Sequence, residues 1–246
     1  AIIAARWPER RAVLQSVTPR VVSLYAVAAV LIGVNWFLYV YSVNNGFVVE
    51  SSLGYFITPL VNVLMGVIVF RERLRQMQWV AVAFAFSGVV WLTIAYGTLP
   101  WIGVALAASF GSYGLVKKAA PLPSLEGLAL ETAVLLVPAG LYLVALHLRG
   151  AGAFLHSRTG TDMLLVAGGV VTIVPLLLFA TAVRRIPLSV VGVLQYIAPT
   201  IQFLLGGFAF QEPFTRAQLA GFGLVWLGLV VFAVDGMRLR SSSPCT

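Results

Sequence analysis

The chain has 246 residues, of which 60% are hydrophobic and only 10% are charged; this excludes a soluble globular domain, because such a domain needs a charged surface. The net charge of +8 comes from Lys and Arg in short clusters between long apolar blocks, so it gives no basic face for a nucleic acid. The single cysteine, Cys245, excludes an intrachain disulfide, and neither histidine has the spaced partners of a metal site, so we expect no metal and no cofactor.

Apolar blocks long enough to cross a bilayer follow one another along the chain. Crossing an apolar slab of ~30 Å takes about 20 helical residues, and in lipid every backbone polar group must be hydrogen-bonded within the protein. We therefore predict an all-α integral membrane protein. The eight predicted helices are 21–43, 47–70, 77–96, 99–116, 126–148, 162–182, 187–210 and 217–236.

The basic residues of the short loops alternate between the two sides of this predicted bundle. One side holds Arg6, Arg10, Arg11, Arg20, Arg71, Arg73, Arg75, Lys117, Lys118, Arg184, Arg185, Arg238 and Arg240, and the other holds Arg149, Arg158 and Arg216. Basic loops face the cytoplasm in membrane proteins. We therefore predict a multi-pass protein of the cell membrane with a cytoplasmic C-terminus.

The first predicted helix, 21–43, carries Asn35, Tyr39 and Ser42 on one face, with Trp36 beside them. Aromatic rings with a polar tip suit either the wall of a cavity or the aromatic belt at the membrane surface. Tyr39 is near the outer end of the helix, so a place in the aromatic belt is the alternative for this residue. We take Asn35, Trp36 and Tyr39 as candidates for the wall of a solute cavity.

Two carboxylates fall inside predicted helices, Glu50 in 47–70 and Glu131 in 126–148. A carboxylate within the membrane is a candidate site for a coupling proton or cation. The alternative is a side chain that reaches the hydrated headgroups.

Two predicted helices, 47–70 and 187–210, carry matching polar faces, because spacings of four, three and four residues place each set on one side of its helix. The first face holds Tyr55, Pro59, Asn62 and Gly66, and the second holds Gln195, Pro199, Gln202 and Gly206, with Tyr196 following Gln195. One interpretation is that the faces meet near the midplane and line a solute path, with Pro59 and Pro199 as hinges. The other is a dry helix interface in which the amides bond to each other.

The predicted helix 99–116 has Gly103, Ala107 and Gly111 at four-residue spacing, which favours close helix packing. Tyr113 flanks this stripe and is a further candidate for a cavity wall.

The segment from Tyr55 to Pro59 is similar to the segment from Gln195 to Pro199, at an offset of 140 residues (199 minus 59). The same offset pairs Gly66 with Gly206, Glu72 with Glu212 and Gly88 with Gly228. We interpret Glu72 and Glu212 mainly as helix caps or partners of nearby arginines. The copies lie an odd number of helices apart, so they cross the membrane in opposite directions, as in many secondary transporters.

This inverted repeat divides the chain into residues 1–97 and 98–246. The second part has five predicted helices, whereas the first has three and the end of another, in residues 1–6. We therefore expect a ten-helix protein, with two units of five, whose first helices lie upstream of Ala1.

Three tracts of this sequence resemble one known family: Ile32 to Trp36, Val43 to Asn45, and Glu50 to Leu60. They are similar to the RarD subgroup of the EamA transporters, within the drug/metabolite transporter superfamily. Arg71 to Leu74 and Gln195 to Thr200 fit the same pattern, whereas Thr58 stands where the subgroup's pattern has Asn. The resemblance implies ten helices in two inverted units, a central cavity open to one side at a time, and a prokaryotic cytoplasmic membrane.

Our first functional hypothesis is a secondary transporter of small organic solutes, without enzymatic activity. The alternative is a sensor or scaffold that keeps the fold and moves nothing. A membrane-embedded enzyme fits less well, because Asp162 and Asp235 lie at predicted helix ends, and there is no phosphate-binding loop for ATP. The expected partners are a small-molecule solute and the lipid bilayer. The sequence leaves open whether the protein forms a homo-oligomer.

Overall fold

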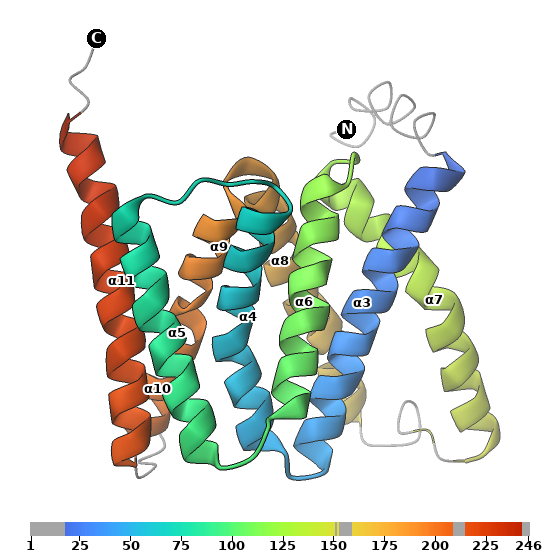
Figure 1. Ribbon diagram of the computed structural model, residues 1–246. Helices are drawn as coiled ribbons and strands as arrows, with labels where there is room; N and C mark the ends of the chain where they lie inside the picture. The colour runs from blue at the N-terminus through green and yellow to red at the C-terminus, as the bar shows by residue number, and fades with distance from the viewer. Residues whose placement is uncertain (1–17, 151, 153–158, 209–214, 243–246) are drawn as a thin grey trace. The chain divides into compact units, whose positions relative to one another are not determined.

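The computed structural model describes residues 18–150, 152, 159–208 and 215–242, and all regular structure there is α-helical (Figure 1). The helices are α3 (Pro19–Asn44), α4 (Val48–Ile68), α5 (Gln76–Tyr96), α6 (Trp101–Ala119), α7 (Ser124–Leu148), α8 (Thr159–Arg185), α9 (Leu188–Gln195), α10 (Ile197–Phe208) and α11 (Arg216–Ser242). The all-helical prediction is confirmed.

Six of these helices, α3, α4, α5, α7, α8 and α11, are long and apolar enough to cross a membrane. The other two predicted spans coincide with α6, which has 19 residues and two lysines in its last turn, and with the α9–α10 pair. Every block predicted from the sequence therefore falls on a helix or a pair of helices.

The predicted helix 187–210 is interrupted at Tyr196, so its described residues form two helices, α9 and α10. Proline has no backbone N–H, so Pro199 leaves the carbonyl of Gln195 without its helical donor. At the break a backbone hydrogen bond spans three residues instead of the four of an α-helix: the Tyr196 N–H donates to the Val193 carbonyl at 3.2 Å. The related Pro59 lies inside α4, which continues without a break.

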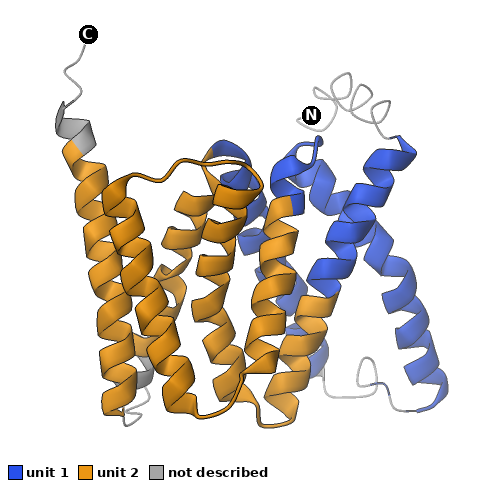
Figure 2. Cartoon of the chain, in the orientation of Figure 1, with its two compact units in different colours: residues 1–33, 116–185 blue, residues 34–115, 186–246 orange. Residues whose placement is uncertain are grey.

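Two compact units divide the chain (Figure 2). The first unit holds residues 1–33 and 116–185, and the second holds residues 34–115 and 186–246. Each unit thus combines helices from both halves of the sequence.

In the second unit, the core lies among α4, α5, the α9–α10 junction and α11. The rings of Phe56 and Phe222 meet edge to face, with their centroids 4.8 Å apart. Along α5 and α11, which run side by side in Figure 1, glycines bring the backbones together. A Cβ on Gly88 would lie 2.7 Å from the Gly221 carbonyl oxygen, and one on Gly228 would lie 2.6 Å from the Ala81 carbonyl oxygen. Small residues allow this approach where lipid supplies no hydrophobic drive between helices.

The small-residue stripe of α6 packs on α4, as its spacing predicted. A Cβ on Gly103 would lie 2.7 Å from the Glu50 carbonyl oxygen, and one on Gly111 would overlap the side chain of Val61. α9 approaches α4 in the same way, since a Cβ on Gly192 would lie 2.6 Å from the Pro59 carbonyl oxygen. The α4 helix is therefore in backbone contact with neighbours on two sides.

In the first unit, Tyr25 of α3 is buried with Ala120 and Leu122 of the α6–α7 connection. Its hydroxyl lies 3.1 Å from the Leu122 nitrogen and 3.3 Å from the Leu122 oxygen. The guanidinium of Arg184, at the end of α8, donates to the carbonyls of Ala120 and Leu122. Side chains from α3 and α8 thus hold this connection. They form hydrogen bonds with backbone groups that have no partner within a helix.

Candidate functional site

The two polar faces predicted on 47–70 and 187–210 meet at Asn62 and Gln195. The Asn62 amide nitrogen donates to the Gln195 side-chain oxygen at 2.5 Å. Asn62 is fully buried, in the second half of α4, and Gln195 is the last residue of α9, directly before the break. The Asn62 Oδ1 atom is buried and has no hydrogen-bond partner in the described part of the chain. The contact therefore joins repeat-related faces, and one acceptor of Asn62 has no partner among the described side chains.

A row of aromatic rings connects the second half of α3 to α4. Trp36 and Tyr39 meet edge to face with centroids 6.1 Å apart, and Tyr39 meets Tyr55 in the same way at 6.2 Å. The rings of Trp36 and Tyr55 are partly exposed. The spacing of α3 alone did not indicate that Tyr39 lies against Tyr55.

Asn35 lies beside this row and bonds to α6. Its amide nitrogen donates to the Leu106 carbonyl at 2.9 Å and to the Ser109 hydroxyl at 3.0 Å. The Asn35 amide therefore fastens α3 to α6, and its predicted place in a cavity wall stays a prediction.

Two of the predicted cavity tyrosines are buried in packed surroundings. Tyr113 is fully buried on α6, with its ring centroid 5.9 Å from that of Phe110. Tyr196 is buried in the core of the second unit, and its hydroxyl donates to the Phe56 carbonyl at 3.1 Å. The side chain of Gln202 lies outside the described residues, although its backbone belongs to α10.

Glu50 is buried near the start of α4, where it meets the ends of two other helices. Its carboxylate accepts a hydrogen bond from the Tyr96 hydroxyl at 3.0 Å and one from the Ile102 N–H at 3.3 Å. Ile102 is the second residue of α6, so Glu50 caps the N-terminus of that helix, where a negative charge is favourable. This cap is a structural role that the position of Glu50 in its own helix did not indicate.

Glu131 forms a buried ion pair that the sequence did not predict. The Lys117 ammonium lies 2.8 Å from the Glu131 carboxylate, and both side chains are 2% exposed. The ammonium also lies 5.5 Å from the centre of the Tyr25 ring, over its face. The sequence predicts a cytoplasmic loop position for Lys117, because basic residues normally end a span. Fourteen residues separate the pair, and only the turn between α6 and α7 brings them together.

These polar groups suit hydrogen bonding to a solute better than bond-making chemistry. Among the described residues, no group of three or more His, Cys, Asp and Glu side chains is placed to hold a metal. The amides and phenols at the meeting points can donate and accept hydrogen bonds but do not include an activated nucleophile.

A model of the EamA-like transporter family matches residues 2–94 and again residues 99–234, which together make up most of the chain. The chain belongs to the EamA-like transporter family. Protein RarD of Streptomyces exfoliatus is 49% identical over 238 residues, which cover 97% of this chain and 75% of that protein. The uncharacterised transporter YojE of Bacillus subtilis (strain 168) is 42% identical over 238 residues, or 96% of this chain and 78% of that protein.

A solved crystal structure has the same fold, with a TM-score of 0.63 and 20% identity over 96% of this chain and 83% of that one. These comparisons confirm the predicted EamA membership and the similarity to RarD proteins. The chain is therefore a multi-pass membrane protein of a transporter family.

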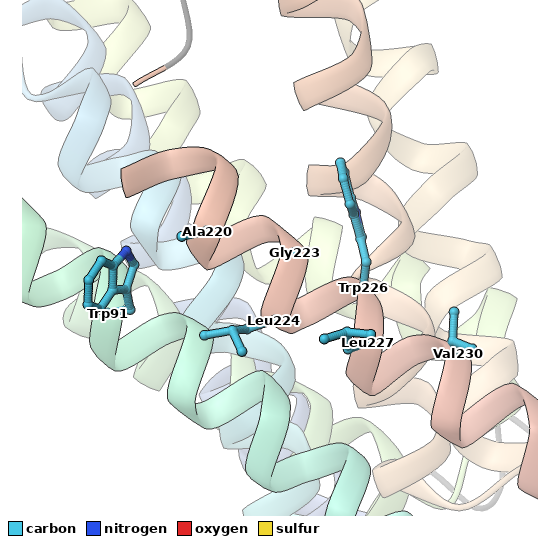
Figure 3. Close-up of a pocket in the computed structure, with 7 residues that line it drawn as sticks. All are labelled: Trp91, Ala220, Gly223, Leu224, Trp226, Leu227 and Val230. Atoms are coloured by element: carbon cyan, nitrogen blue, oxygen red, sulfur yellow. The ribbon is translucent and has the colours of Figure 1, made fainter. Parts of the chain in front are cut away.

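The structure of this EamA chain also has an apolar groove of about 670 Å³ between α5 and α11 (Figure 3). Its wall includes Trp91, Gly223 and Trp226. Both indole N–H groups are already used, that of Trp91 on the Ala217 carbonyl and that of Trp226 on the Thr200 hydroxyl, each at 3.1 Å. The groove therefore offers no donor to a polar solute, and the polar candidates lie elsewhere.

Proposed function

We propose that this protein is a secondary transporter that moves small organic solutes by alternating access. The observation that carries the proposal is the bond between Asn62 and Gln195, which joins two repeat-related faces beside a broken helix. In transporters built from inverted repeats, the solute site lies near the midplane at the repeat interface and is formed by discontinuous helices. Membership of the EamA family supports the same function.

The buried amide pair suits a solute that forms hydrogen bonds. Among the described residues the buried Oδ1 atom of Asn62 accepts no hydrogen bond, which is costly in an apolar interior, and a solute donor would satisfy it. The aromatic row of Trp36, Tyr39 and Tyr55 would supply a flat apolar surface with hydroxyl groups at its edge. In this proposal the amides bond to each other in one conformation and to the solute in another.

The test is solute flux in proteoliposomes that contain protein produced from the complete coding sequence. A screen across organic solutes comes first, and Asn62→Leu is then compared with Asn44→Ala, which removes an exposed amide bonded only within its own helix. We expect Asn62→Leu to lower flux by about tenfold or more, because an unpaired polar partner is left in the site. Unchanged flux in Asn62→Leu would remove the amide pair from the solute site.

The alternative is a sensor or scaffold with the same fold. A folded protein that binds a solute but gives no flux in the screen would favour that alternative. We expect no enzymatic turnover of the solutes in the same preparations.

We also propose Glu50 and Glu131 as candidates for coupling solute movement to a proton or cation. Both carboxylates are buried in described helices, and a buried charge changes its stability when the surrounding helices move. Flux by Glu50→Gln measured at several pH values tests the first candidate. A pH dependence identical to that of the unchanged protein would exclude Glu50 from coupling.

A further inference from the structure

The carboxylate of Glu72 lies at the N-terminus of α9. It accepts hydrogen bonds from the Leu188 N–H at 2.7 Å, the Ser189 N–H at 2.9 Å and the Ser189 hydroxyl at 2.7 Å. The first N–H groups of a helix have no partner within the helix, and its N-terminus favours negative charge. Glu72 therefore caps α9, although it follows α4 in the sequence.

The backbone after α4 is shaped to deliver this carboxylate. Arg71 has a positive φ of 54°, in the left-handed region, and the Glu72 N–H then donates to the Gly66 carbonyl at 3.1 Å. Gly66 leaves the slot through which the Glu72 side chain passes, since a Cβ there would lie 2.5 Å from that carboxylate and 2.9 Å from the Ser189 nitrogen. The repeated glycine and glutamate thus act together.

The short helix α9 has eight residues and is held on α4 at three levels. Glu72 holds its first turn, Gly192 contacts the Pro59 carbonyl in the middle, and Gln195 bonds to Asn62 at its end. The break at Tyr196 separates α9 from α10, so α9 does not have to move with the rest of its span.

Glu72 is half-buried, whereas Glu50, the comparable cap of α6, is buried. Its neighbours Arg71 and Arg73 are exposed at the same end of α4. Water and these guanidinium groups can stabilise the carboxylate after it leaves α9, which they cannot do for a carboxylate inside the bundle.

We propose that Glu72 is a positioning residue of the transport cycle: its carboxylate holds α9 on α4, keeps Gln195 at Asn62, and is released when the two helices separate. This inference rests on the proposed transport function, because only alternating access requires the separation. It assigns to Glu72 a conformational role in addition to its role as a cap.

Hydrogen–deuterium exchange of the complete protein in nanodiscs tests the cap. Glu72→Gln removes the charge with little change in shape, and we expect the α9 amides, from Leu188 to Gln195, to exchange about tenfold faster. Asn44→Ala is the control, because the Asn44 amide bonds to Val40 of its own helix, and it should leave exchange in α9 unchanged. Unchanged exchange in α9 overturns the proposal.

A second measurement separates positioning from simple capping. Val193 is buried on α9, and Val193→Cys in a Cys245→Ser background reports the opening of α9 from α4 through its reaction with a membrane-impermeant maleimide. We expect Glu72→Gln to raise the labelling rate severalfold, and Glu72→Asp, whose shorter side chain cannot span the slot, to do the same. Faster exchange confined to Leu188 and Ser189, with unchanged labelling, overturns the positioning role.

Both measurements use no solute. Absence of flux in the transport screen would therefore refute the proposed function while leaving the behaviour of α9 as measured. Flux without any effect of Glu72 on α9 would refute only the positioning role.

Discussion

At the scale of single residues, the pair of Lys117 and Glu131 illustrates how burial within the protein changes the cost of a charge. Removing two ions from water costs several kcal/mol each, and their attraction offsets this cost only while both are present. The pair closes the α6–α7 turn from inside the first unit, next to the ring of Tyr25. A lone carboxylate at Glu131 would be unfavourable, so any coupling role requires Lys117 to change partner.

We predict that Glu131→Gln is strongly destabilising, because it leaves the Lys117 ammonium buried without its carboxylate. Breaking a buried pair on one side typically costs about 3–5 kcal/mol. The double variant Lys117→Met with Glu131→Leu should recover most of the lost stability, since no charge is then buried. Thermal unfolding in detergent, followed by tryptophan fluorescence, measures both, and a double variant as unstable as the single one would contradict this explanation.

The sequence predicted Glu131 as an intramembrane carboxylate but did not predict its partner, Lys117. Lys117 stands beside Lys118 at the end of an apolar block, a pattern typical of the cytoplasmic edge. The burial of one of two adjacent lysines depends on which side of α6 faces α7 and α3. Hydropathy does not contain that information.

At the scale of helices, the close approach of α5 and α11 depends on glycines whose roles differ along one helix. Gly228 faces the α5 backbone, whereas a Cβ on Gly223 would have no neighbour within 4 Å and would point into the groove of Figure 3. Of these two glycines, five residues apart, Gly223 has room for a side chain and Gly228 does not.

We predict that Gly228→Ala destabilises the protein by about 1–3 kcal/mol, because the new methyl group forces the two backbones apart. Gly223→Ala is the matched control and should leave stability unchanged or slightly raised, since Ala favours helix over Gly. The unfolding temperature in detergent distinguishes them. Equal effects of the two changes would show that helix propensity, rather than packing, decides the outcome.

The repeat pairs Gly88 with Gly228, and both prevent a clash at the α5–α11 contact. The prolines of the same repeat differ, because Pro199 accompanies a break and Pro59 lies in a continuous helix. Residues paired by the repeat thus lie on corresponding faces of their helices. Whether the helix backbone breaks at a paired proline depends on the helices packed around it.

At the scale of the whole molecule, the orientation in the membrane stays a prediction from the basic loops. The C-terminal tail carries the only cysteine of the sequence, Cys245, which makes the prediction easy to test. We expect a membrane-impermeant maleimide to leave Cys245 unlabelled in intact cells and to label it in inverted membrane vesicles. Labelling in intact cells would place the C-terminus outside and reverse the orientation of every helix.

The sequence by itself determined that the chain is an all-helical membrane protein, where its helices lie, and that it contains a repeat. In lipid each backbone must satisfy its own hydrogen bonds, so length and hydropathy along the chain suffice to predict the helices, and the match between segments 140 residues apart reveals the repeat. Only the tertiary structure decided that Asn62 meets Gln195, that Glu72 caps α9 and that Lys117 pairs with Glu131. These contacts join residues from different helices, and they depend on where the helices cross and where glycines let them approach.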